Sequence, residues 1–309
     1  MRAIVADPSA SPALALADVP EPSPGPGQLL VDVEAASINR GEVRLAAAKP
    51  AGTVIGWDVA GTVAALGEGV TQFDVGDRVV GLSEAGGAFA ERAVVPAAWT
   101  APLPDACDFV TASTLPVAGV TAVGILRLGR VHAGDRVLIT GAAGGVGHLA
   151  VQLAVQANAT VTGQARSQER GEAVRAAGAE ALVHPGDGSP VDGEFDVVLD
   201  SIGGPVLAAL VEATAVKGRM VVYGNSADAE SSFRIERLYN KGVTLYGFRV
   251  FTVVLPEQAV KDMANLAEQA AAGRLQVHVH ATAPLADALR LVRDLYARRV
   301  AGKVVITRG

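Results

Sequence analysis

A glycine-rich turn is the part of the sequence most clearly suited to chemistry. Residues 141–147 hold four glycines in seven positions, after a short β-branched apolar run at 136–140 that is typical of a strand buried on both faces. From His148 the apolar residues follow helical spacing, and 161–162 begin a second strand. This order of strand, glycine turn, helix and strand places a pyrophosphate against the N–H groups of a helix N-terminus. A Cβ in such a turn would hold the phosphate oxygens away from the backbone.

The glycine pattern departs from the G-x-G-x-x-G fingerprint at one position. Ala142 replaces the first glycine, whereas Gly144 and Gly147 keep the later two. A plain turn of an α/β protein is the alternative interpretation, but the strand before and the helix after supply the context that the motif requires. We therefore predict a dinucleotide site. Its contacts are expected from Gly141, Ala142, Ala143, Gly144, Gly145, Val146 and Gly147.

The residues after the second strand predict which dinucleotide binds. NAD sites usually place Asp or Glu about 20 residues after the glycines, where the acid accepts from the ribose 2′-OH. Here the strand end carries no acid, and Arg166, Ser167 and Arg170 offer guanidinium and hydroxyl donors. Guanidinium groups bind a 2′-phosphate bidentately, whereas a carboxylate would repel it. We predict NADPH rather than NADH; the alternative is a solvated loop and helix start.

The composition indicates a compact α/β protein and excludes several other classes. The chain has 309 residues, 50% of them hydrophobic, with 35 glycines and a net charge of −6, which is long enough for two domains. The sequence shows no Lys/Arg run for nucleic acid, no 18-residue apolar segment for a membrane span and no signal-like N-terminus, so a cytoplasmic protein is expected. Cys107 is the only cysteine, which excludes disulfides and cysteine-based zinc sites within one chain.

The elements that must position the turn change in character along the chain. Up to about residue 110 the sequence predicts short strands with glycine corners, as in a small, partly open barrel. A helix interrupted by Pro116 and Gly119 follows, and from 135 to about 246 strands and helices alternate, which predicts a doubly wound sheet. The tail is expected to pack back onto the first domain. The first strands are expected at 1–6, 29–36, 54–66, 78–82 and 89–95, and the last at 303–307.

Five segments of the chain resemble the medium-chain dehydrogenase/reductase superfamily. They are the glycine turn, Leu-Pro-Val-Ala-Gly-Val-Thr-Ala at 115–122, Gly-Trp-Asp-Val-Ala-Gly-Thr-Val at 56–63, Gly-Gly-Ala-Phe-Ala-Glu-Arg at 86–92 and Ala-Gly-Lys-Val-Val-Ile at 301–306. The resemblance covers essentially the whole chain in the family's order. It implies an α/β protein with a GroES-like, partly open β-barrel catalytic domain at 1–112 and 250–309. A doubly wound Rossmann NADP(H)-binding domain is implied at 113–249.

The positions that resemble the zinc ligands of alcohol dehydrogenases in this superfamily carry other residues. The segment resembling the first cysteine site reads Ser-Ile-Asn-Arg-Gly-Glu at 37–42, Trp57 stands at the histidine position, and the four-cysteine loop is missing. A zinc site needs three or four ligands together, so we predict no metal. The chain resembles the zinc-independent branch of quinone oxidoreductases and enoyl reductases. That implies metal-independent hydride transfer from NADPH to a quinone or an activated C=C bond.

The resemblance places three residues in catalysis. Asn39 lies where the family segment turns into the cleft, and its amide is expected to donate to the substrate oxygen; an Asn turn or cap is the alternative. Trp57 is expected to shape the substrate pocket, and Thr121 to contact the nicotinamide ribose or carboxamide. Core packing is the alternative for both.

The charged residues near Asn39 are expected to be structural. Arg40 and Glu42 are expected to form an ion pair near the cleft, with a catalytic role as the alternative, and Asp58 is expected to accept hydrogen bonds. No residue stands out as a proton donor. Tyr223 and Tyr246 are candidates, although each is more often an aromatic that packs in a strand.

Further cofactor contacts are predicted at the carboxyl edge of the sheet, where ligands of open α/β sheets lie. Tyr223 ends a strand there, Gly224 is expected to allow close approach of the cofactor, and Asn225 to bind it. Tyr239 is expected either to serve the cofactor phosphate or to be helix surface. The segment at Phe248 and Arg249 resembles the family segment whose backbone meets the nicotinamide amide.

Two other functions stay open at this point. One is a metal-free ketone reductase, which would oxidise an alcohol with NADP⁺; the other is a non-catalytic NADPH-binding protein, since this branch resembles some lens crystallins. The expected partner is a small quinone, enone or enoyl substrate, with neither nucleic acid nor a membrane. The apolar strand at 243–247 lies at the predicted sheet edge and suggests a homodimer, because an uncovered apolar edge invites aggregation.

Overall fold

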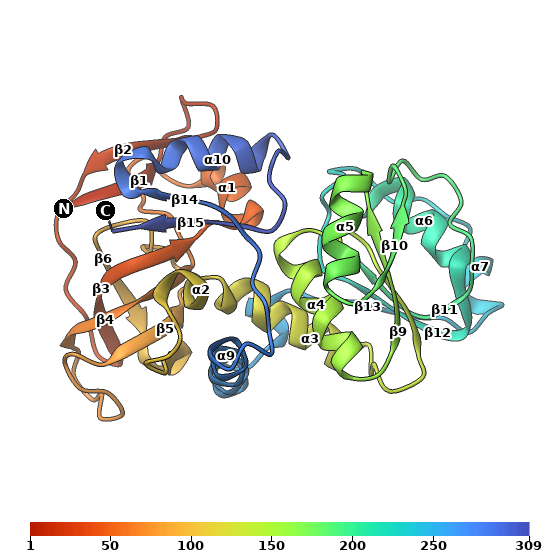
Figure 1. The fold of residues 1–309 in the computed structure, drawn as a ribbon. Helices are drawn as coiled ribbons and strands as arrows, with labels where there is room; N and C mark the ends of the chain where they lie inside the picture. Colours follow the sequence, from red (N-terminus) through yellow and green to blue (C-terminus); the bar gives the residue numbers. More distant parts are fainter. Residues whose placement is uncertain (309) are drawn as a thin grey trace. The chain divides into compact units, whose positions relative to one another are not determined.

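The computed structural model describes residues 1–308, which divide into two compact units (Figure 1). The first unit comprises Met1–Val120 and the chain from Leu255 onwards, and the second comprises Thr121–Val254. The boundaries expected from the sequence, at 112/113 and 249/250, lie eight and five residues before these.

The second unit is built on a parallel sheet (Figure 1). It has six strands in the order β10-β9-β8-β11-β12-β13. Numbered within this unit, the order is 3-2-1-4-5-6, that of doubly wound dinucleotide-binding folds. The doubly wound sheet predicted from the alternation of strands and helices is therefore confirmed. The strands are β8 (Arg136–Ile139), β9 (Thr160–Ala165), β10 (Glu180–Val183), β11 (Phe195–Asp200), β12 (Thr214–Val222) and β13 (Thr244–Gly247).

Helices cover both faces of this sheet. The chain winds in opposite directions from β8 and β11, so right-handed crossovers place α4 (Gly145–Gln156) and α5 (Gln168–Ala176) on one face and α6 (Gly204–Ala213) on the other. Leu138 and Val198 pack with Leu210 of α6. Val137 and Val197, which alternate with them, are also fully buried, as expected of strands covered on both sides. The remaining helices are α3 (Val120–Leu128), α7 (Glu236–Tyr239) and α8 (Val250–Val253).

The first unit is built on a mostly antiparallel sheet in the order β14-β15-β3-β4-β5-β7, with β6 also paired to β3. The predicted return of the tail is confirmed, because β15 pairs with β3 and places Val305 opposite Ser37. The sheet strands are β3 (Gln28–Ser37), β4 (Asp58–Leu66), β5 (Arg78–Leu82), β6 (Arg92–Pro96), β7 (Thr100–Pro102), β14 (Val279–Pro284) and β15 (Lys303–Thr307). A separate pair is formed by β1 (Arg2–Ala6) and β2 (Leu14–Asp18).

Short helices complete the first unit. The interrupted helix expected around Pro116 is present as α2 (Phe109–Ser113), a π-helical turn η3 (Leu115–Gly119) and then α3, since proline cannot continue the helical hydrogen bonds. The others are α1 (Arg40–Leu45), η1 (Ala46–Ala48), η2 (Ala97–Trp99), α9 (Pro256–Ala271), η4 (Leu285–Asp287) and α10 (Ala288–Tyr296).

Two local features of the first unit, between residues 39 and 58, differ from what the sequence predicts. The strand expected from residue 54 begins only at Asp58, because Gly56 has a φ of +110° and a Cβ there would lie 2.5 Å from the Phe89 amide nitrogen. Helix α1 was not anticipated, although Asn39 followed three residues later by Glu42 is a capping-box signature.

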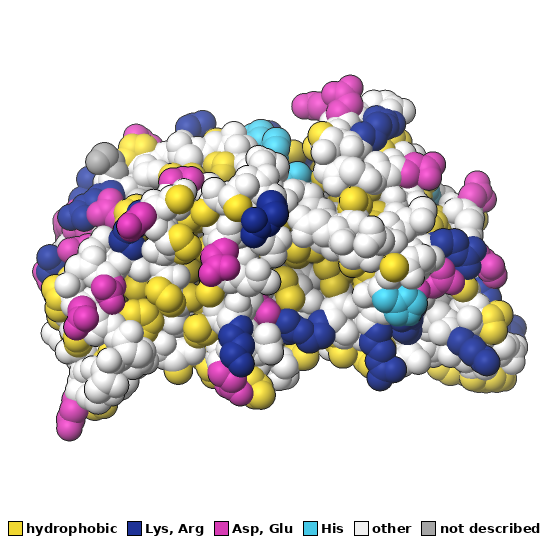
Figure 2. All heavy atoms as spheres, turned by 60° about the horizontal axis from the view of Figure 1, so that its bottom comes forward, with side chains coloured by type: hydrophobic (Ala, Val, Ile, Leu, Met, Phe, Trp, Pro, Cys, Tyr) yellow, Lys and Arg dark blue, Asp and Glu magenta, His cyan; other side chains and the backbone are white. Residues whose placement is uncertain are grey.

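The described surface has mixed charge. Figure 2 shows Lys and Arg side chains scattered among Asp and Glu on the face drawn, rather than gathered into one tract. Within residues 1–308, none of the helices is both long and apolar enough to cross a membrane.

Candidate functional site

The glycine turn of the second unit forms a tight backbone cradle. Gly141 adopts a φ of +60°, and its N–H donates to Oε1 of Gln164 at 3.1 Å, while the Ala142 N–H donates to the Gln164 carbonyl. Helix α4 starts directly afterwards, with Gly144 as its N-cap. A Cβ on Gly147 would lie 2.3 Å from the Gly141 carbonyl oxygen. Only glycine therefore fits at Gly147, and the N–H groups of the first helical turn stand at the carboxyl end of β8, where they suit a pyrophosphate.

An aspartate that the sequence reasoning missed ties this turn to the neighbouring strand. Asp200, fully buried at the end of β11, accepts from Thr140 Oγ1 at 2.7 Å and from the Ile202 and Gly203 N–H groups at 3.0 and 2.9 Å. The Ser201 N–H in turn donates to Thr140 Oγ1. Burial raises the pKa of Asp200. The strands β8 and β11 flank the point where the winding direction reverses, which is where ligands bind in such sheets. The sequence did contain a signal for Asp200, because an acidic residue ends the mostly apolar run at 195–200.

Tyr223, Gly224 and Asn225 lie at this same point. The Tyr223 hydroxyl donates to the Thr140 carbonyl at 3.3 Å, and burial raises its pKa. A Cβ on Gly224 would lie 2.9 Å from the Ser201 carbonyl oxygen, so this glycine allows close approach of two backbone segments. The Asn225 side chain lies against Gly203. The three residues are thus brought to the turn, and their contacts with a cofactor stay predictions.

The residues predicted to select the dinucleotide follow β9. Arg166 is exposed, and Ser167 is the N-cap of α5, where its hydroxyl accepts from the Arg170 N–H at 3.3 Å. No acid follows β9 before Glu169, which lies in the first turn of α5. The helix start given as the alternative is therefore present directly after Ser167. Binding of a 2′-phosphate by the two arginines stays a prediction.

The other predicted cofactor residues occupy different surroundings. Thr121 is buried near the start of α3. The Phe248 ring packs on Gly124 of the same helix, where a Cβ would lie 2.4 Å from the ring. The Arg249 guanidinium lies 5.1 Å from the centroid of the Phe251 ring. Tyr239 on α7 is 65% exposed, which is consistent both with a contact to the cofactor phosphate and with a position on the helix surface.

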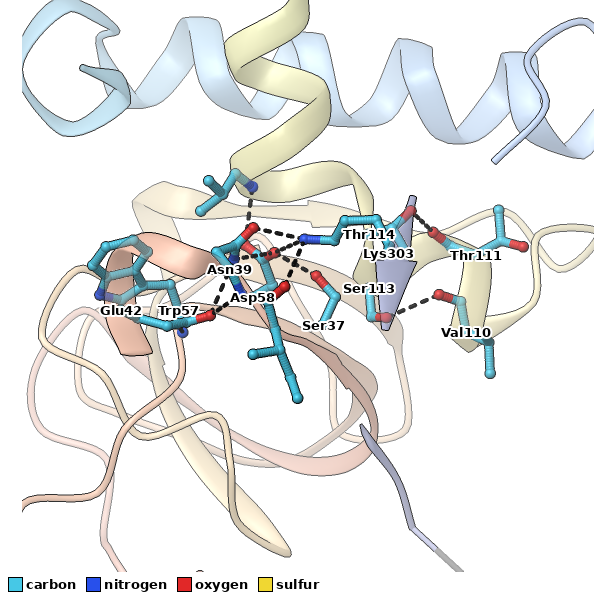
Figure 3. Close-up of polar contacts among 12 residues, drawn as sticks. Ser37, Asn39, Glu42, Trp57, Asp58, Val110, Thr111, Ser113, Thr114 and Lys303 are labelled. Atoms are coloured by element: carbon cyan, nitrogen blue, oxygen red, sulfur yellow. Dashed lines mark hydrogen bonds and ion pairs between the residues drawn. The ribbon is translucent and has the colours of Figure 1, made fainter. Parts of the chain in front are cut away.

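The first unit contains a buried cluster of charged and amide side chains (Figure 3). Asp58 accepts from Ser37 Oγ at 2.6 Å, from Asn39 Nδ2 at 2.8 Å and from the Val117 N–H at 2.9 Å, so the predicted role as hydrogen-bond acceptor is confirmed. Lys303 Nζ donates to Asn39 Oδ1 at 2.6 Å and lies 3.5 Å from Asp58 Oδ2. The sequence reasoning did not single out Lys303.

Glu42 is joined to this cluster through Asn39. Its Oε1 accepts from the Asn39 N–H at 2.5 Å and from Asn39 Nδ2 at 3.2 Å, and its Oε2 accepts from the Trp57 N–H at 2.7 Å. The Glu42 carboxyl is therefore held by Asn39 and Trp57, whereas the sequence had suggested an ion pair with Arg40. The Asn39 amide hydrogens point at Glu42 and Asp58, and donation to a substrate oxygen stays a prediction.

Burial controls the electrostatics of the cluster. It raises the pKa of Glu42 to about 8, aided by the nearby Asp58 carboxylate and opposed by the Asn39 and Trp57 N–H groups and by Lys303. Burial likewise lowers the pKa of Lys303, against the attraction of Asp58 and Glu42. Two carboxyl groups thus share one ammonium group among buried side chains.

Glu42 and Trp57 also line a small open pocket of the first unit. The Trp57 ring lies over the start of α1, where a Cβ on Gly41 would be 3.2 Å from the ring. The wall is otherwise mostly apolar. It comprises Leu45, Lys49, Val54, Ile55, Gly56, Ala85 and Gly86.

The side chains near the zinc-like positions do not suit a metal ion. In the described part of the chain, no three His, Cys, Asp or Glu side chains are grouped so as to hold one. The two acids that are present, Glu42 and Asp58, accept from amide, hydroxyl and backbone donors, and Lys303 already supplies a positive charge. This donor set does not fit tetrahedral zinc.

Comparisons with known proteins match both units. Residues 25–105 match the family "Alcohol dehydrogenase GroES-like domain", and residues 145–269 match "Zinc-binding dehydrogenase". A probable quinone oxidoreductase of Leishmania amazonensis is 33% identical over 81% of this chain and 78% of its own length. Prostaglandin reductase-3 of Bos taurus is 30% identical over 94% of this chain and 83% of its own length.

A solved structure agrees with these relatives. Escherichia coli quinone oxidoreductase complexed with NADPH superposes with a TM-score of 0.89 and 25% identity, over 99% of this chain and 100% of that one. Further relatives include polyketide synthases, of whose length the matches cover 10 to 15%.

Proposed function

The chain belongs to the quinone oxidoreductase branch of the medium-chain dehydrogenase/reductase superfamily, and from this premise we propose that it uses NADPH to reduce a small quinone or an activated alkene. The relatives named as a quinone oxidoreductase and a prostaglandin reductase support this reaction class. The Escherichia coli structure with NADPH supports the cofactor.

One observation carries the proposal. The glycine turn at 141–147 opens α4 beside the reversal point between β8 and β11. The next strand, β9, ends at Ala165 and is followed by Arg166 rather than by an acid. This arrangement suits a pyrophosphate at the helix N-terminus and a phosphorylated ribose one strand further out.

Each part of the site then has a task. Bound NADPH supplies a hydride from its nicotinamide C4. The backbone N–H groups of the turn hold the pyrophosphate, and Arg166 and Arg170 hold the 2′-phosphate. The open pocket beside Trp57 offers a mostly apolar wall against which a planar acceptor is oriented. Quinones and activated alkenes suit such a site, because the charge that develops on their oxygen requires only hydrogen-bond donors.

We also propose that the protein forms a homodimer through β13. This strand is the edge of the sheet and pairs only with β12 among the described strands. Leu245 on it is 41% exposed. Pairing with the same strand of a second copy would cover the free N–H and C=O groups of the edge.

The proposed activity is tested by following NADPH and NADH oxidation with a quinone and with an α,β-unsaturated ketone, with and without a chelator. Turnover that prefers NADPH and is unchanged by the chelator is the expected result. Oxidation of an alcohol with NADP⁺ would favour the ketone reductase instead. Tight NADPH binding without turnover of any acceptor would favour a non-catalytic protein.

A further inference from the structure

Reduction of an activated alkene requires a proton as well as a hydride. The tyrosine nearest the predicted cofactor site does not suit this task, because the Tyr223 hydroxyl already donates to the Thr140 carbonyl and burial raises its pKa. Under the proposed function, the proton must therefore come from another group.

We propose that the Glu42 carboxyl group protonates the α-carbon of an alkene substrate bound over the mouth of the small pocket beside Trp57. Glu42 is the only acidic side chain lining that pocket, whose wall is otherwise apolar apart from Lys49. Figure 3 places Glu42 next to Trp57 and connects it through Asn39 to Asp58 and Lys303.

The hydrogen bonds of Glu42 leave room for a proton. A carboxyl group offers about four acceptor positions. In the described structure three donors reach it: two from Asn39 on Oε1 and the Trp57 N–H on Oε2. The remaining position is on Oε2. The same contacts fix the carboxyl group rigidly beside the pocket, as a proton donor requires.

The surrounding charges favour the protonated form. Asp58 on β4 and Lys303 on β15 face the cluster from the strands, and Lys49 lies at the pocket wall. With both acids ionised, the buried cluster of Glu42, Asp58 and Lys303 would carry one uncompensated negative charge, which is costly for buried groups. A proton on Glu42 removes that charge. This agrees with a Glu42 pKa raised to about 8 by burial and by Asp58.

The proton balance of the step is simple. The β-carbon of the alkene receives the hydride, and the former π-electron pair moves toward the carbonyl oxygen as an enolate. When the enolate collapses, a C–H bond forms at the α-carbon as the O–H bond at Glu42 Oε2 breaks. The carboxylate that remains takes a new proton from solvent through the open pocket. A quinone differs, because its oxygens take their protons and no C–H bond forms at an α-carbon.

This difference makes the ratio of alkene to quinone turnover the decisive measurement. Damage to folding or to NADPH binding lowers both rates alike, whereas loss of the proton donor lowers the alkene rate selectively. We expect Glu42→Gln to lower the ratio by about 100-fold or more, the usual effect of removing a general acid. Glu42→Asp, which keeps a titratable carboxyl, should restore part of the ratio. Glu68→Gln, at an exposed acid of the same unit, should leave it unchanged.

A second readout needs no turnover. The infrared spectrum of Glu42→Gln is subtracted from that of the wild type, both without cofactor. The difference should contain the band of a protonated carboxylic acid, and this band should disappear as the pH rises through about 8. The alkene turnover number of the wild type should fall over the same range.

Three results would overturn the assignment: an unchanged ratio in Glu42→Gln, no titrating infrared band, or wild-type turnover of the quinone alone. Failure of the proposed function would look different, because the wild type would then turn over neither acceptor while the infrared band still titrated.

Discussion

At the scale of single residues, the cluster around Asn39 shows how few side chains can organise a charged site. The Asn39 amide oxygen accepts from Lys303, and its nitrogen donates to Glu42 and Asp58. One side chain therefore aligns both acids and the ammonium group. Its neutral amide does this without adding to the buried charge.

Arg166 allows a direct test of the cofactor preference. Replacing it by alanine should weaken NADPH binding by about 10- to 100-fold, since a charged hydrogen bond contributes about 1.5–3 kcal/mol, and should leave NADH binding nearly unchanged. Fluorescence titration with both nucleotides measures this. Arg175→Ala, at an exposed arginine near the end of α5, is the matched control. Equal weakening of both nucleotides would contradict the role of Arg166.

Glu42 should also make stability depend on pH. Its pKa is about 8 in the folded protein and near the ordinary 4.5 after unfolding, so the folded state retains a proton that the unfolded state loses. This contribution is complete below pH 4.5 and is lost as the pH rises through 8, by up to about 5 kcal/mol. Asp200 shifts in the same direction. The free energy of unfolding, measured with urea between pH 5 and 8, should therefore fall more steeply with pH for the wild type than for Glu42→Gln. Parallel pH dependences of the two proteins would refute the raised pKa of Glu42.

At the scale of elements, the link between β8 and α4 depends on close backbone approach. Gly147 and Gly163 both allow this close approach. A Cβ on Gly163 would lie 2.8 Å from the Ala142 Cβ and 2.5 Å from the Val174 side chain. The turn is therefore held between the start of its own helix and the adjacent strand β9.

Gly147→Ala tests this geometry. The new Cβ would meet the Gly141 carbonyl at 2.3 Å, so the first turn of α4 must shift. We expect NADPH affinity to fall about tenfold or more and the free energy of unfolding to fall by about 1–3 kcal/mol. Calorimetric binding and urea unfolding measure the two effects. Gly144→Ala, where the contact distance is 3.1 Å, should be milder; a reversed order would count against the cradle.

At the scale of the whole molecule, the exposed edge of the parallel sheet determines the expected assembly. Leu245→Lys places a charge on β13 and should convert the dimer to a monomer in sedimentation velocity, since charged residues on an edge strand oppose pairing. Val75→Lys, at a valine that is 64% exposed in the first unit, should leave the assembly unchanged. A monomeric wild type would reject the dimer outright.

The sequence alone determined the parts of the molecule that depend on near neighbours. The strands at 78–82 and 303–307 were predicted with their observed bounds, because alternating or continuous apolar runs indicate strands locally. The glycine turn was recognisable for the same reason, as its strand, turn and helix are contiguous in the chain.

Only the tertiary structure decided which distant side chains meet. Lys303 reaches Asn39 across 264 residues, because β15 pairs with β3 in a register that no local pattern specifies. Asp200 meets Thr140 across 60 residues because β8 and β11 are neighbours in the sheet. Local periodicity determines what an element is, whereas strand order and register determine which side chains are brought together, and so where buried charge must be shared.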